Sequence, residues 1–174
     1  NNINAARATL LYKASDTVNI TVRGDMMFDH SLPTAPSNFL VNDDDDIFTF
    51  ENTLEVTRKN IVEPWGVSAT IDASYDSFDL KSITAYRELR FRNVNDVDGR
   101  ADVRSFEVEK QILNEWQFSQ ETFITADNLG DTDLKLTAGV FYLHEKNDFT
   151  WALRIFAPPT TQYFDQDTDT LALY

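Results

Sequence analysis

Residues 66–92 read GVSATIDASYDSFDLKSITAYRELRFR and carry the pattern that decides the fold. From Gly66 to Tyr75, apolar and polar residues alternate with a period of two, which is typical of a β-strand with two different faces. The short turn Asp76-Ser77 leads into a second strand-like stretch, Phe78 to Arg92. The apolar phase of this stretch changes near Ser82, which predicts a β-bulge there. The whole segment therefore predicts an antiparallel hairpin.

The same alternation recurs along the rest of the chain. It predicts further strands over Ala6–Lys13, Val18–Arg23, Glu115–Ala126, Leu134–Glu145 and Thr170–Tyr174. Tight turns are predicted at Ala14–Thr17 and Asp127–Asp133, and long polar excursions at about residues 26–64, 93–114 and 146–167. Short and long connections thus alternate. The sequence predicts an all-β, antiparallel up-and-down meander of about six to seven strands.

Charge and composition exclude several classes of function. The formal net charge of -14, from 29 acidic and 15 basic residues, repels phosphate and argues against a nucleic-acid partner. Because cysteine is absent, disulfides, thiol catalysis and thiolate metal sites are excluded. No run approaches the roughly 18 apolar residues that a membrane helix requires. If the chain meets a membrane, strands must cross it.

The alternation of tight turns and long loops is typical of outer-membrane β-barrels. A barrel strand alternates because one face touches lipid and the other touches water, while closure satisfies the backbone. Aromatic residues near the ends of the predicted strands suit the girdles at the membrane interfaces, namely Tyr12, Tyr75, Trp116 and Tyr142. The polar phase predicts that five charged residues face the lumen, namely Arg7, Arg23, Asp72, Glu121 and Lys135.

A soluble secreted β-sandwich is an alternative, since its strands also alternate when one face packs on a core. Such a module would bind glycans through Trp65, Trp116 or Trp151. Long structureless excursions are rare in compact domains and stand against it. Seven strands cannot close as a bacterial barrel, which uses an even number. We therefore expect residues 1–174 to be a segment of a single outer-membrane barrel domain, with the remaining strands elsewhere.

Several stretches resemble TonB-dependent outer-membrane receptors. They are Ala6–Asp25 (ARATLLYKASDTVNITVRGD), Gly66–Arg87 (GVSATIDASYDSFDLKSITAYR), Gln117–Ala126 (QFSQETFITA), Leu134–Asp148 (LKLTAGVFYLHEKND) and the closing TDTLALY. The resemblance implies a barrel of about 22 strands with a plugged lumen, of which this chain is roughly a third. The plug domain and the energy-coupling box of the family are not among these residues.

The resemblance also implies a function. It implies a bacterial outer-membrane location, contact with outer-membrane lipid and the plug domain, and energy supplied through the TonB complex. The cargo would be a scarce small solute such as a ferric siderophore or a glycan. A passive or autotransporter-type barrel has the same strand pattern without plug or coupling, and it remains an alternative.

No catalytic, cofactor or metal site is predicted. The acidic run Asp43–Asp46 lacks the glycine and glutamate spacing of a calcium loop and is interpreted as a solvated surface. The only imidazoles, His30 and His144, have no second histidine nearby and are interpreted as loop or interface residues. No nucleophile elbow is present, and the spacing of four glutamates does not predict an acid/base pair, namely Glu51, Glu55, Glu107 and Glu109. We therefore predict that the chain is not an enzyme, and no solute-binding residue is identified.

Overall fold

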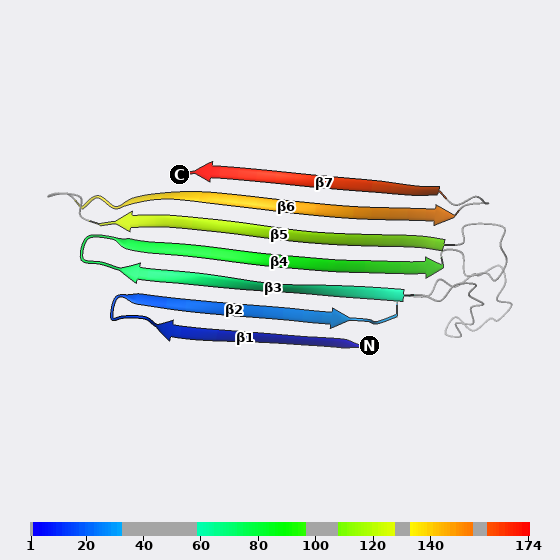
Figure 1. Cartoon of the computed structure of the whole chain (residues 1–174), viewed down its shortest axis with the longest axis horizontal. Helices are drawn as coiled ribbons and strands as arrows, with labels where there is room; N and C mark the ends of the chain where they lie inside the picture. Colours follow the sequence, from blue (N-terminus) through cyan, green and yellow to red (C-terminus); the bar gives the residue numbers. More distant parts are fainter. Residues whose placement is uncertain (1, 33–58, 97–107, 128–132, 155–159) are drawn as a thin grey trace, which may run out of the picture.

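The computed structural model describes residues 2–32, 59–96, 108–127, 133–154 and 160–174, and these form one sheet of seven strands. The strands are β1 Ile3–Lys13, β2 Val18–Asp29, β3 Lys59–Ser74, β4 Asp79–Asp96, β5 Val108–Ala126, β6 Leu136–Arg154 and β7 Thr160–Leu173. Their spatial order equals their order in the chain, and every pair is antiparallel (Figure 1). The predicted all-β meander is confirmed. The sheet is not closed, because β1 and β7 are its two edges.

The tight turns lie at one end of the sheet (Figure 1, left). Between β1 and β2, the Ala14 amide donates to the Val18 carbonyl at 2.9 Å. Between β3 and β4, the Tyr75 amide donates to the Phe78 carbonyl at 2.9 Å and closes the two-residue turn that the sequence predicts. Both turns are confirmed. The predicted turn at Asp127–Asp133 lies partly outside the described residues.

Away from these turns, the strands run further than the periodicity predicts. β3 begins at Lys59, β5 begins at Val108 and β6 continues to Arg154. The predicted excursions are therefore wrong at residues 26–29 and 59–64, at 93–96 and 108–114, and at 146–154 and 160–167, whereas residues 33–58, 97–107 and 155–159 lie outside the described part of the chain. These distal parts alternate poorly because charged and apolar side chains occur on both faces. Pairing with neighbouring strands, which a single-sequence period does not report, holds them extended.

The predicted bulge near Ser82 is also wrong. β4 pairs without interruption with β3 and β5, and Ser82 stands opposite Ile71 and Thr122. The apolar phase changes because Ser82 and Thr84 place hydroxyls on a face that is apolar in β3. The change of phase is thus a change of side-chain chemistry on a regular strand.

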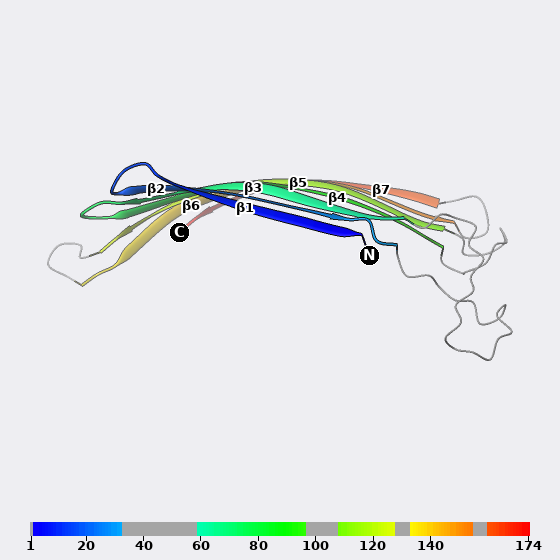
Figure 2. The same cartoon turned by 90° about the horizontal axis from the view of Figure 1, so that it is seen from below.

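The described sheet is a single layer without a core (Figure 2). Ala73 is its buried apolar residue, with 4% of its surface exposed, whereas Leu10 is 67% and Leu173 is 77% exposed. A soluble sheet buries one face against a second layer, and no second layer occurs among the described residues. No helix in the described part of the chain is long and apolar enough to cross a membrane.

Candidate membrane-contacting surface

The register assigns each side chain to one of two faces, because directly paired residues point the same way and neighbours alternate. Leu10, Val22 and Ala69 are paired in one row and define the belt face. On its turn-proximal half this face carries a set of mostly apolar residues, here called the apolar belt. Its members are Ala6, Ala8, Leu10, Tyr12, Ile20, Val22, Met26, Val67, Ala69, Ile71, Ala73, Leu80, Phe118, Ile124, Ala138, Val140, Tyr142, Leu171 and Leu173. The belt reaches all seven strands.

A row of rings borders the apolar belt on the side away from the turns. Ring centroids are 5.4 Å apart for Trp65 and Tyr86, 6.2 Å for Tyr86 and Trp116, and 4.9 Å for Trp116 and His144. These four residues are the aromatic row. Beyond it, the belt face carries a zone rich in charged residues, here called the distal zone. Its charged members include Glu63, Arg90, Arg92, Asp148 and Asp165, while Glu88, Lys146 and Asp167 stand in the same register row as Trp65 and Trp116.

The height of the belt matches that of an outer-membrane barrel. From Trp65 in the aromatic row to Tyr75 beside the tight turn, the chain advances ten residues, roughly 33 Å at about 3.3 Å per residue. In an outer-membrane barrel, whose strands tilt by about 40°, this length would span roughly 25 Å, the usual height of the lipid-facing band. Tyr12 and Tyr75 lie at the turn end as predicted. Trp116 and Tyr142 lie inside β5 and β6 and not at their ends, because these strands continue past the belt.

Four polar side chains interrupt the belt in β4 and β5, namely Ser82, Thr84, Gln120 and Thr122. Gln120 Nε2 donates to Ser82 Oγ and to Thr122 Oγ1, each at 3.0 Å, and Thr84 Oγ1 donates to Gln120 Oε1. Ser82 Oγ and Thr122 Oγ1 lie 3.1 Å apart. We call this group the polar quartet. Because its members bond to one another, they can be desolvated at a lower cost than isolated polar groups.

The opposite face, here called the polar face, holds most of the residues predicted to line a lumen. Arg7, Arg23, Asp72 and Glu121 lie on it. Asp72 forms an ion pair with Lys81 at 3.1 Å, and Glu121 accepts a hydrogen bond from the Tyr174 hydroxyl at 2.8 Å. The register separates these four predicted residues into different rows. Lys135 precedes β6 and forms an ion pair with Asp127 at 3.3 Å beside the turn. Because Lys135 is outside the strands, the register does not assign it to either face, and its predicted lumenal position stays a prediction.

A glycine on the polar face lets side chains from two non-adjacent strands meet. Gly66 in β3 stands between Asp25 in β2 and Arg87 in β4 in the register. Arg87 Nη2 donates to Asp25 Oδ2 at 3.0 Å across it. A Cβ on Gly66 would lie 3.1 Å from Arg87 Cγ and 3.1 Å from the Tyr86 carbonyl oxygen. Such an exposed ion pair contributes about 1 kcal/mol at most, so the glycine matters mainly for close packing.

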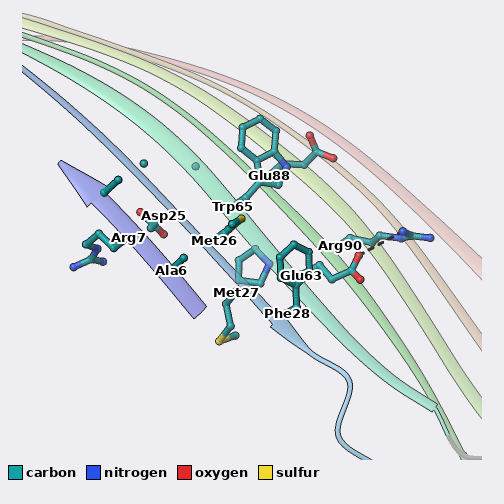
Figure 3. A pocket seen from close by; sticks show the side chains of 14 residues that line it. Ala6, Arg7, Asp25, Met26, Met27, Phe28, Glu63, Trp65, Glu88 and Arg90 are labelled. Atoms are coloured by element: carbon teal, nitrogen blue, oxygen red, sulfur yellow. Dashed lines mark hydrogen bonds and ion pairs between the residues drawn. The ribbon is translucent and has the colours of Figure 1, made fainter. Parts of the chain in front are cut away.

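The belt face is hollowed near β1 and β2. An open depression of about 560 Å³ has a low floor where Ala6, Ala8 and Gly24 lack long side chains. Figure 3 shows Met26 and Trp65 beside it, with the Glu63–Arg90 pair at one end. The depression is largely apolar and opens onto the same surface as the belt, so we treat it as part of that surface.

The remaining candidates from the sequence are dispersed. His30 Nε2 lies 2.7 Å from Glu63 Oε1. Trp65 and Trp116 lie on the belt face, whereas Trp151 lies on the polar face, so the three do not form one glycan platform. Asp43–Asp46, Glu51, Glu55 and Glu107 are outside the described residues, and Glu109 is in β5 opposite Leu153.

Sequence reasoning missed one cluster. His144 Nδ1 lies 2.9 Å from Asp169 Oδ1 and 3.6 Å from Asp167 Oδ1. The two aspartates stand on β7, in a stretch that the sequence predicts to be mostly an excursion. In the sequence, the spacing of Asp167 and Asp169 indicates that both aspartates point to one face of a strand. The sequence does not reveal the β6–β7 register that brings them to His144.

Comparisons of the chain with family models, with curated proteins and with solved structures found no match. The structural features that bear on function are therefore the two faces of the sheet and the boundary that the aromatic row makes on one of them.

Proposed function

We propose that this chain forms part of the wall of an outer-membrane β-barrel in an energy-coupled, TonB-dependent transporter that takes up a scarce solute such as a ferric siderophore or a glycan. The apolar belt faces lipid, and the polar face lines the water-filled or plugged interior. The plug domain and the TonB complex act through the rest of the protein.

The observation that carries the membrane part of this proposal is the apolar belt on a single, uncovered sheet. Leu10, Leu171 and Leu173 are 67%, 70% and 77% exposed. At about 25 cal/mol per Å² of apolar surface, leaving such a belt in water is costly, whereas lipid accepts it. The polar quartet fits the same environment because its groups satisfy one another.

The transport part rests on the resemblance of the quoted segments to TonB-dependent receptors. A passive or autotransporter-type barrel has the same belt and differs in the absence of energy coupling. A soluble β-sandwich requires a second sheet, and the described strands all belong to one sheet. The passive barrel is therefore the second candidate, because it shares the apolar belt that the sandwich does not explain.

Uptake by cells that carry the full encoding gene separates these functions. The probes are radio-iron-labelled ferric siderophores and fluorescent oligosaccharides, and the strains are the parent, a deletion of this gene and a deletion of the coupling protein TonB. We expect the protein in the outer-membrane fraction and accumulation of one probe that is lost in both deletions.

Two results would contradict the proposal. Accumulation that needs this gene but persists without TonB would identify a passive barrel. Recovery of the protein in the soluble fraction, as a monomer that stays folded without detergent, would overturn the membrane role altogether.

A further inference from the structure

The cluster of His144, Asp167 and Asp169 joins two strands on the belt face. His144 in β6 stands directly opposite Asp169 in β7, and Asp167 lies two residues away on the same face. One nitrogen or oxygen atom from each of the three side chains lies within 4.8 Å of the others. The β6–β7 backbone pairing fixes the three Cα positions, so the cluster does not depend on a loop.

The spacing suits one shared metal ion. Ligand atoms about 2.0–2.2 Å from a metal lie about 3.0 Å from each other at octahedral edges and about 3.4 Å at tetrahedral edges. His144 Nδ1 is 2.9 Å from Asp169 Oδ1 and 3.6 Å from Asp167 Oδ1, which brackets these values. The side chains are 24%, 58% and 65% exposed for His144, Asp167 and Asp169, so water can supply further ligands.

Neighbouring groups favour a cation at this position. The Tyr142 hydroxyl donates to Asp169 Oδ1 at 2.7 Å and orients that carboxylate, as outer-shell partners of metal ligands do. Asp148 and Asp165 stand directly opposite each other on the same face, an arrangement of like charges that is unfavourable across strands. Lys146, directly opposite Asp167, carries one positive charge against the four carboxylates of Asp148, Asp165, Asp167 and Asp169, so this part of the face stays negative.

We propose that His144, Asp167 and Asp169 bind a divalent transition-metal ion of the Zn²⁺ class, with water completing its coordination. An imidazole nitrogen among the ligands favours such an ion over Mg²⁺ or Ca²⁺, which take oxygen ligands. The bound ion cross-links β7 to β6 beside the aromatic row. The site needs the β6–β7 pairing and not the membrane role, so the two proposals can fail separately.

The test is a Zn²⁺ titration of the full 174-residue chain, folded in detergent micelles as shown by its β-sheet circular dichroism. Calorimetry measures the affinity, and NMR of the two imidazoles reports which one binds. His144→Gln and Asp169→Asn each remove one ligand. Asp165→Asn removes the same charge from the same face of β7 outside the trio, and His30→Gln removes the other imidazole.

We expect Zn²⁺ to shift the His144 signals, and we expect H144Q and D169N each to weaken binding by at least about tenfold. D165N should weaken it by less than about threefold, since a carboxylate that is not a ligand contributes only screened attraction. H30Q should leave the affinity unchanged. The imidazole spectrum of the unmodified chain keeps the test decisive if a variant misfolds.

Three results would overturn the site. Folded chain that binds no Zn²⁺ would leave a plain ion pair between His144 and its carboxylates. Equal weakening by D165N and D169N would indicate diffuse attraction to an acidic surface. Binding that shifts His30 and leaves His144 unchanged would place the metal elsewhere.

Discussion

The apolar belt and the distal zone belong to the same face of the same strands, yet they differ in chemistry. In the belt, Leu10, Val22 and Ala69 form one paired row, whereas in the distal zone Glu63 pairs with Arg90. From β3 to β6 the paired register crosses the aromatic row without a break, whereas the β2–β3 pairing skips Met27 and Phe28 just beyond Trp65. Each of the strands from β3 to β6 is therefore continuous through both zones, and what changes is the chemistry of the side chains on this face. β3 to β6, with 16 to 19 residues, exceed the 9 to 11 that cross a bilayer.

A charge placed in the two zones tests this contrast with the largest expected effect. Val22→Arg puts a guanidinium in the middle of the belt and should lower the free energy of unfolding in phospholipid vesicles by about 2–4 kcal/mol. Thr150→Arg puts the same group on the same face in the distal zone, opposite the uncharged Ile112 and Tyr163, and should cost about 0–1 kcal/mol. Urea titrations followed by tryptophan fluorescence measure both. Equal costs would mean that the two zones share one environment.

Glycine replacements compare the two faces at neighbouring positions. Gly66→Ala places a Cβ 3.1 Å from the Tyr86 carbonyl oxygen on the polar face and should destabilise the sheet by about 1–3 kcal/mol. Gly24→Ala places a Cβ on the belt face, 3.7 Å from its nearest atom, and should stabilise the strand by about 0.5 kcal/mol. The same urea titration applies. If Gly24→Ala costs as much as Gly66→Ala, the close packing of β2 to β4 is not as described.

The polar quartet sharpens the contrast within the belt itself. Gln120→Ala removes the group that bonds to Ser82, Thr84 and Thr122 and should cost about 1 kcal/mol in vesicles. Gln117→Ala, on the polar face of the same strand, is the matched control and should cost less. A larger loss for Gln117→Ala would contradict the proposed lipid-facing position of the quartet.

The sequence alone predicted the part of the fold where one face is consistently apolar. From Gly66 to Tyr75 the alternation is complete, and both the strand and its turn are confirmed. The sequence-based prediction failed where a regular strand does not alternate between apolar and polar residues. Ser82 is polar on a face that is apolar in β3, and residues 146–154 form a strand although several of them are charged. The period-two alternation alone predicted that Arg7, Arg23, Asp72 and Glu121 share one face, and the register agrees.

The aromatic row and the cluster around His144 were harder to predict because both depend on the register between strands. A row such as Trp65, Tyr86 and Trp116 requires the register of three strands, and tertiary pairing sets that register. His144 looked isolated because its partners are more than twenty residues away in sequence and beside it only in the sheet.

Depth-dependent quenching by brominated phospholipids tests most directly whether the belt face lies against lipid. Three variants of the full chain in vesicles each keep one tryptophan, with the other two replaced by phenylalanine. Bromines near the headgroup should quench Trp65 and Trp116 on the belt face strongly, and Trp151 on the polar face weakly. Equal quenching of all three, or the strongest quenching of Trp151, would contradict the assignment of the belt face to the membrane.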